Sequence, residues 1–174
     1  MARIDLIDGK DGLAPEQAEL YDWIIESRGT LVRPFQVLLH APRPAEHLAR
    51  LGHVVRFESG LSGADRELAI LATGSAHGCQ YVWDTHVGIA SREGVRPEAL
   101  AHLDGTPTDL SEREAAIFGA VRELCESSSL SDLTFSRVES ELGSGGVAEL
   151  CVLVGYYTLL GYTMGAFGVC SVPD

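Results

Sequence analysis

Three side chains that take part in proton transfer and thiol chemistry, Glu67, Cys79 and His86, lie within a stretch of 20 residues. Carboxylates and imidazoles act as general acids and bases, and a thiolate acts as a nucleophile. If a helix begins at Cys79, then Cys79, Trp83 and His86 follow the i, i+4, i+7 spacing that places side chains on one helical face. The spacing therefore predicts a thiol, an indole and an imidazole along one stripe.

The carboxylate of Glu67 is expected to point into the protein. It shares a predicted helix face with three apolar or small residues, Ile70, Leu71 and Gly74. A buried carboxylate needs a polar partner. Because Gly78 separates two predicted helices, a hairpin that turns there would bring the face of Glu67 towards Cys79 and His86. The three residues would then share one pocket that holds an acid or base, a nucleophile and a proton shuttle.

Two interpretations of this cluster stay open. In the functional interpretation, a helix N-terminus and the imidazole stabilise Cys79 as a thiolate, and burial beside Trp83 raises the proton affinity of Glu67. In the structural interpretation, Cys79 is a small core residue, His86 packs beside Trp83, and Glu67 favours the first turn of a capped helix. The residue types alone do not separate the two.

The elements that must position these residues are helices. Proline, capping and periodicity signals predict seven or eight of them, whereas the alternation typical of strands is confined to the N-terminal arm, residues 1–14. Two predicted helices follow Pro15 and Pro44, and the others cover 62–77, 79–93, 97–103, 111–126, 131–142 and 146–168. The sequence therefore predicts an all-α protein.

The overall composition fits one globular domain that spans residues 1–174. Lys and Arg number 13 against 25 Asp and Glu, and the resulting net charge of −12 disfavours nucleic acids and anionic membrane surfaces as partners. The four cysteines lack the spacing of a zinc site or a disulfide framework, and the N-terminus carries no recognisable secretory signal. We therefore expect a cytoplasmic protein that binds a small molecule and no metal.

Residues 150–170 form an uncharged run of 21 residues, which is long enough to cross a bilayer. Four glycines and three tyrosines make the run small and partly polar, and no Lys or Arg flanks it as a membrane anchor. The alternative is a buried helix, in which the spacing of Gly161 and Gly165 lets another backbone approach closely. We favour this alternative and expect a homo-oligomer that associates partly through the helix at 146–168.

Two segments carry a resemblance to a known family. Residues 66–71 read Arg-Glu-Leu-Ala-Ile-Leu, and residues 78–86 read Gly-Cys-Gln-Tyr-Val-Trp-Asp-Thr-His. Together they resemble the carboxymuconolactone decarboxylase family of the alkylhydroperoxidase D-like (AhpD-like) superfamily, and less specific signatures at 34–40 and 154–157 extend the resemblance over most of the chain. The resemblance implies an AhpD-like helical fold, obligate homo-oligomers and a pocket around the motif Glu-x11-Cys-x2-Cys-x3-His.

In this sequence the motif reads Glu67, Cys79, Val82 and His86, so the second cysteine is missing. The peroxidase branch of the superfamily uses both thiols, one to attack and one to resolve the sulfenic acid. The decarboxylase branch often has an acidic residue where Val82 stands, so the pocket of this chain would be drier and less acidic than usual. The resemblance therefore favours a lyase over a thiol peroxidase.

The function expected from these features is a cofactor-free lyase on a small lactone or carbonyl acid, with His86 as general acid/base and Glu67 and Cys79 beside it. Candidate substrate-binding residues are the neighbours of the motif and the nearest cations, namely Tyr81, Val82, Trp83, Arg33 and Arg66. Three alternatives stay open: a cyclase or isomerase for a bulkier metabolite, a thiol peroxidase or disulfide reductase, and a non-catalytic oligomeric binding protein. The expected reaction requires no metal or cofactor.

Overall fold

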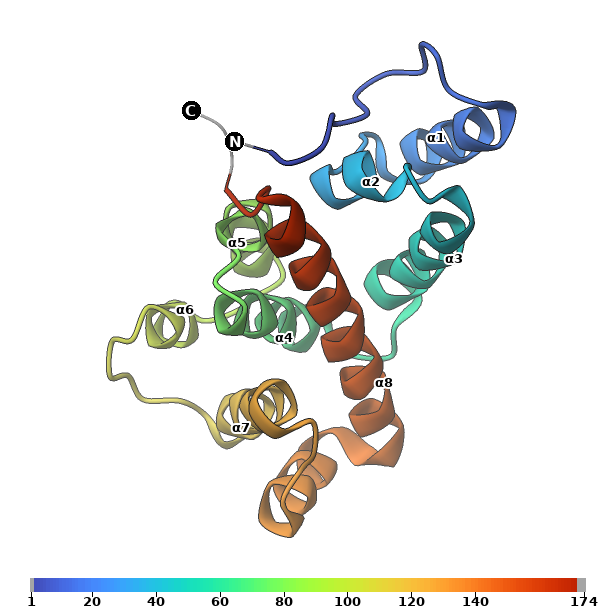
Figure 1. The fold of residues 1–174 in the computed structure, drawn as a ribbon. Helices are drawn as coiled ribbons and strands as arrows, with labels where there is room; N and C mark the ends of the chain where they lie inside the picture. Colours follow the sequence, from blue (N-terminus) through green and yellow to red (C-terminus); the bar gives the residue numbers. More distant parts are fainter. Residues whose placement is uncertain (1, 172–174) are drawn as a thin grey trace.

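A computed structural model describes residues 2–171, and within this range the backbone forms eight α-helices, one π-helical turn and no β-strand (Figure 1). The helices are α1 (Pro15–Arg28), α2 (Arg33–Leu38), α3 (Pro42–His53), α4 (Gly63–Ala76), α5 (Gln80–Arg92), α6 (Pro97–Leu103), α7 (Glu112–Ser127) and α8 (Asp132–Phe167). The π-helical turn η1 (Val54–Glu58) continues α3 without a break. The predicted all-α fold is confirmed.

α4 and α5 form a helical hairpin whose ends follow from local sequence signals. The side chain of Ser62 accepts a hydrogen bond from the N–H of Asp65 at 3.1 Å and so caps the N-terminus of α4. Gly78, between the two helices, has a φ of 60°, a left-handed conformation that glycine adopts without strain. The chain therefore turns where the sequence predicts, and α5 packs against α4.

α4 lies in the middle of the molecule, within a large hydrophobic core (Figure 1). It contacts α5, α6, α7 and α8, and every residue from Glu67 to Gly74 is buried. A smaller core joins α1, α2 and α3 around Ile24, Phe35 and Leu39. Because α2 and η1 both contact α8, the two cores meet along this helix.

The eight α-helices agree in number with the seven or eight predicted, but two places differ in which segments form a helix and in where a helix is continuous. α2 has only six residues, which is too short for helical periodicity to show, and the sequence prediction lacks it. The predicted helices 131–142 and 146–168 are the two parts of α8, which bends at Gly143, where φ is 70° and ψ is 165°. Glycine accepts these angles at low cost, so the chain bends there and resumes as a helix.

Two helices also begin at other residues than predicted. α3 begins at Pro42 rather than after Pro44, since the first proline already occupies the favoured first-turn position. α5 begins at Gln80, so Cys79 is its N-cap residue and lies outside the helix. The second difference changes the direction in which a candidate catalytic side chain points.

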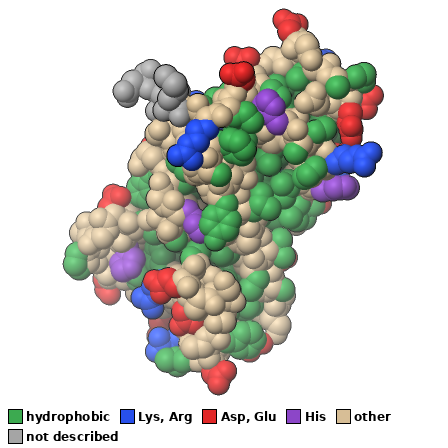
Figure 2. Space-filling view, in the orientation of Figure 1, with side chains coloured by type: hydrophobic (Ala, Val, Ile, Leu, Met, Phe, Trp, Pro, Cys, Tyr) green, Lys and Arg blue, Asp and Glu red, His purple; other side chains and the backbone are tan. Residues whose placement is uncertain are grey.

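α8 is long and apolar enough to cross a membrane by the criteria of length and composition alone. In the protomer it bends at Gly143 and packs against α2, α4 and α7. Part of its surface faces outward, where Val152, Leu159 and Tyr162 are 47%, 37% and 66% exposed. Figure 2 shows apolar side chains gathered over this part of the molecule. A contiguous exposed apolar face of this kind is typical of an interaction surface.

We propose that the exposed face of α8 packs against a second copy of the chain. Two charges introduced together, Leu159→Glu and Tyr162→Glu, should give a species that sediments at the protomer mass of 18.7 kDa, whereas the wild type sediments as an oligomer. Leu133→Glu, a charge at an exposed position before the bend of α8, is the control and should keep the oligomer mass. A monomeric wild type, or a double variant of unchanged mass, contradicts this interface.

Gly161 does not contribute to that surface. It is buried within the protomer, and a Cβ atom there would lie 3.3 Å from the side chain of His77, which follows α4. The close approach predicted at Gly161 therefore takes place inside one chain, whereas Gly165 is open. A larger residue at position 161 would test the packing of the protomer and not its association.

Candidate functional site

Glu67 and His86 form a buried hydrogen-bonded pair between α4 and α5. Nδ1 of His86 lies 2.7 Å from Oε2 of Glu67, and Glu67 is 1% exposed and His86 5%. Arg66 adds a second contact, with its Nε 3.5 Å from Oε1 of Glu67. The predictions that Glu67 points inward and that the hairpin brings it to His86 are confirmed. When Nδ1–H donates to the carboxylate, Nε2 of the neutral imidazole carries the free lone pair.

Tyr157 of α8 faces the other ring nitrogen of His86. Its Oη lies 3.4 Å from Nε2, and the two rings meet edge to face with their centroids 5.5 Å apart. Burial raises the pKa of Tyr157, so its hydroxyl stays protonated and is a donor at neutral pH. Glu67, His86 and Tyr157 therefore form a hydrogen-bonded series that crosses from α4 through α5 to α8.

A small cavity of about 40 Å³ lies beside His86 and Tyr157. Its apolar lining includes Phe35, Val82, Leu160 and Met164, and its polar lining consists of Arg28, Arg56, Tyr81, Thr85, His86, Tyr156 and Tyr157. These residues come from α1, α2, η1, α5 and α8, so both hydrophobic cores contribute. The volume suits a water molecule or a carboxylate-sized group, and a pocket for a whole ligand usually exceeds about 300 Å³.

Two arginines bring positive charge to this cavity without a matching anion. Arg28, the last residue of α1, donates from Nη2 to the carbonyl oxygen of Ala49 at 2.6 Å, and Arg56 comes from η1. Burial lowers the pKa of Arg28, and the positive charge of Arg56 also lowers it. Within residues 2–171 neither guanidinium forms an ion pair, and Nε of Arg28 is buried without a hydrogen-bond partner. The cavity therefore favours the binding of an anion.

Gly52 of α3 makes room for this arrangement. A Cβ atom at position 52 would overlap the hydroxyl of Tyr156 and lie 3.1 Å from Nη2 of Arg28. Tyr156 is buried, so its ring has little freedom to withdraw. A glycine at this position thus lets Tyr156 and Arg28 reach the cavity side by side.

Cys79 lies apart from this site, and its predicted position beside His86 is wrong. As the N-cap of α5 it has extended backbone angles, φ −95° and ψ 91°, so its side chain leaves the helix face that carries His86. It lines a separate pocket of about 230 Å³ together with Trp83, which does not line the His86 cavity either. Burial raises the pKa of the Cys79 thiol to about 12, which opposes the interpretation in which Cys79 is a thiolate.

The other predicted substrate-binding residues divide into two groups. Tyr81 and Val82 line the His86 cavity, whereas the two predicted cations do not. The guanidinium of Arg33 lies 3.5 Å from the carbonyl oxygen of Ser171, and Arg66 is held between two carboxylates at 3.5 and 3.8 Å. Because two carboxylates already neutralise the guanidinium of Arg66, it is poorly suited to bind an anionic substrate group.

Sequence reasoning missed several residues of the cavity, among them Arg28, Arg56 and Tyr157. Tyr157 had a weak signal, since it lies in the segment 154–157 that belongs to the family resemblance. The arginines had none, because each stands far along the chain from the motif and reaches the cavity only through the packing of α1 against α3 and of η1 against α8.

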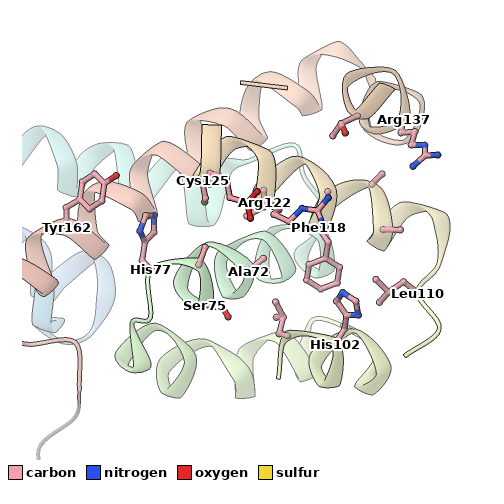
Figure 3. A pocket seen from close by; sticks show the side chains of 18 residues that line it. Ala72, Ser75, His77, His102, Leu110, Phe118, Arg122, Cys125, Arg137 and Tyr162 are labelled. Carbon is pink, nitrogen blue, oxygen red and sulfur yellow. The ribbon is translucent and has the colours of Figure 1, made fainter. Parts of the chain in front are cut away.

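A larger pocket, about 720 Å³ in volume, lies between α4, α6, α7 and α8 (Figure 3). Its histidines are already engaged: His77 lies 3.0 Å from the hydroxyl of Thr158, and the rings of His102 and Phe118 face each other with centroids 5.0 Å apart. The arginines at this pocket, Arg122 and Arg137, are exposed. Since Glu67 and His86 do not line it, the buried acid/base pair belongs to the smaller cavity.

Comparisons with known proteins agree with the helical architecture and with the motif around Glu67 and His86. Residues 42–123 match the family model of the carboxymuconolactone decarboxylase family. No curated protein matches the chain. A solved structure, the alkylhydroperoxidase AhpD core of an uncharacterized peroxidase-related protein from Ralstonia eutropha JMP134, shares the fold with a TM-score of 0.78 at 16% identity, and the match covers 99% of this chain and 92% of that chain. Residues 42–123 therefore resemble the carboxymuconolactone decarboxylase family, and the chain has the helical fold of the AhpD core.

Proposed function

We propose that the protein is a cofactor-independent lyase that acts on a small lactone or carbonyl acid, with His86 as the residue that transfers the proton. One observation carries this proposal: a histidine oriented by a buried carboxylate directs its second ring nitrogen towards a cavity that two unpaired arginines also line. General acid/base catalysis needs an oriented imidazole, and an anionic substrate needs a cation. Both requirements are met within one cavity.

The substrate class follows from the lining of the cavity. Arg28 and Arg56 would hold a carboxylate that the substrate keeps, since a bound anion offsets the repulsion between the two cations. A carboxylate that is to be lost would lie against the apolar wall formed by Leu160 and Met164, where it is poorly solvated. The proposal therefore specifies a substrate with at least two acidic or carbonyl groups.

The proton step uses the series Glu67, His86 and Tyr157. As carbon dioxide leaves, the electron pair of the broken C–C bond moves into the conjugated carbonyl and forms an enolate. The protonated Nε2 of His86 then donates its proton to carbon, and the hydroxyl of Tyr157 donates a hydrogen bond to the enolate oxygen. Glu67 stabilises the imidazolium before the transfer, and solvent restores the proton afterwards.

The size of the cavity sets a further condition. At about 40 Å³ it holds one carboxylate-sized group, so a complete substrate must displace side chains at its edge. Arg56, whose guanidinium has no ion pair or side-chain hydrogen bond within residues 2–171, is the side chain best able to move there. Closing of this side chain over the substrate would exclude water from the reacting atoms.

A thiol peroxidase is the second family activity, and two features oppose it. Val82 replaces the second cysteine of the motif, and Cys79 lies outside the His86 cavity. Burial raises the pKa of Cys79 to about 12, five units above pH 7, which leaves a thiolate fraction of about 10⁻⁵. Catalysis at Cys79 would therefore be slow.

The experiment is a panel of carboxylated lactones and β-keto or enol acids, followed by carbon dioxide release and ultraviolet absorbance. We expect turnover on at least one carboxylated compound without added metal or cofactor, and, in a parallel assay with a dithiol donor, hydrogen peroxide consumption that is far slower than this turnover. Sustained peroxide turnover together with an inert lactone panel would reverse the assignment in favour of the peroxidase.

A further inference from the structure

Cys79 is brought next to Cys170, a residue 91 positions further along the chain. Cys170 follows the C-terminal end of α8, and its carbonyl oxygen accepts a hydrogen bond of 2.6 Å from the N–H of Tyr81, in the first turn of α5. Sγ of Cys79 lies 4.0 Å from the same carbonyl oxygen. The main chain at Cys170 is therefore held against the N-terminus of α5.

The thiol of Cys79 thus lies close to Cys170. Burial raises the pKa of the Cys79 thiol to about 12, and the proximity of Cys170 adds to the rise. Both thiols are free; Cys79 is 3% exposed, and Cys170 is partly exposed. The pair thus combines a sheltered thiol with one that solvent reaches.

We propose that Cys79 and Cys170 form a reversible disulfide, a redox modification site that joins the start of α5 to the segment after α8. The motif position that would hold a neighbouring cysteine is Val82, so Cys170 supplies the second thiol from a distant part of the chain. Cys79 also lines a pocket of about 230 Å³, which gives its sulfur room to move. The inference does not depend on the lyase activity.

The oxidant is a hydroperoxide, and the partly exposed thiol of Cys170 reacts first. The Cys170 sulfur attacks the O–O bond, which yields a sulfenic acid and one alcohol or water. The Cys79 sulfur then attacks the sulfenic sulfur and displaces water, so that two thiols and one hydroperoxide give a disulfide, water and an alcohol or a second water. A dithiol reverses the change by exchange and becomes a disulfide itself.

The high pKa of Cys79 makes this a slow, stoichiometric modification. Because few Cys79 side chains are thiolates at neutral pH, the second step takes minutes to hours rather than the time of a catalytic cycle. Tyr81 and Val82, which follow Cys79 directly, line the His86 cavity, so the bond would also fix the first turn of α5. The modification therefore stabilises one wall of the cavity.

The test uses the full-length chain carrying Cys125→Ser and Cys151→Ser, which leaves Cys79 and Cys170 as its cysteines. After treatment with excess hydrogen peroxide we expect a loss of about 2 Da in intact mass, no thiol titratable after denaturation, and a non-reducing peptide map that links residue 79 to residue 170. Dithiothreitol should reverse all three changes. The oxidised form should melt about 5–15 °C higher than the reduced form, because the bond closes a long loop.

A third substitution, Cys170→Ser in the same background, is the matched control. It should remove the mass loss of about 2 Da and the rise in Tm, while the reduced protein keeps its Tm. The proposal is overturned if both thiols survive peroxide, if Cys170 stops at the sulfinic acid while Cys79 stays free, or if the disulfide forms between two chains. Any of these outcomes would mean that the two sulfurs do not reach bonding distance within one protomer.

Discussion

Replacing His86 by Gln should lower kcat on a verified substrate by about 10²–10⁴-fold, the usual contribution of a general acid or base. The amide of Gln keeps a donor towards Glu67 but cannot carry the proton from solvent to the substrate. The protein should therefore still fold, with an unchanged far-ultraviolet circular dichroism spectrum. Initial rates and a thermal melt on the same preparation measure both effects.

Two control variants test whether the loss of turnover is specific to His86. His102→Gln removes an exposed histidine outside the cavity and should keep wild-type turnover. Cys79→Ser should keep more activity than His86→Gln, since Cys79 lies in a different pocket. If His86→Gln turns over a verified substrate at the wild-type rate, His86 has a packing role only and the proposed mechanism fails.

Arg56→Met should lower kcat/KM for a carboxylated substrate by about 30- to 3,000-fold, the equivalent of about 2–5 kcal/mol for removing one partner of a buried charge pair. Met keeps much of the side-chain volume and removes the charge. The loss should appear mainly in KM, because a carboxylate that is not lost in the reaction is bound about equally in the ground and transition states. Measuring kcat and KM separately tests this division.

Two controls test whether the effect of Arg56→Met comes from the lost ion pair with the substrate: a neutral substrate and a second arginine. A neutral ester of the same substrate should lose little with Arg56→Met, since it makes no ion pair with the guanidinium. Arg50→Met removes a nearby arginine that is already paired with Glu46 at 2.9 Å, and it should keep wild-type kinetics. Equal losses in Arg50→Met and Arg56→Met, or an equal loss on the ester, would show that Arg56 does not bind the carboxylate.

The part of the site that the sequence predicted rests on local rules. Glu67 points inward because it shares a face with apolar residues, and His86 meets it because Gly78 turns the chain between the two helices. Cys79 was misplaced by a shift of one residue in the start of α5, which moved its side chain from the helix face to the cap. Helix boundaries are the least certain part of a periodicity argument.

The part that the sequence missed depends on contacts between distant segments. Arg28 and Arg56 are ordinary arginines in their local sequence, and they become a pair only when α1 and η1 pack beside the same cavity. The same holds for Cys170, whose neighbour Cys79 lies 91 positions away. No periodicity or spacing rule relates such residues, because their distance is set by the tertiary fold.

The π-helical turn η1 has a consequence for how the chain tolerates insertion and deletion. A π-helix closes its hydrogen bonds over one residue more than an α-helix, so removing one residue from Val54–Glu58 would let α3 continue in regular form. Each residue between the deletion and the end of η1 at Glu58 would then turn by about 100° relative to α3. The guanidinium of Arg56 would leave the cavity, while most of the hydrophobic core would be unaffected. One additional residue in this helix is thus sufficient to direct the guanidinium of Arg56 into the His86 cavity. A chain of the same fold without that residue would present a different side chain to the cavity.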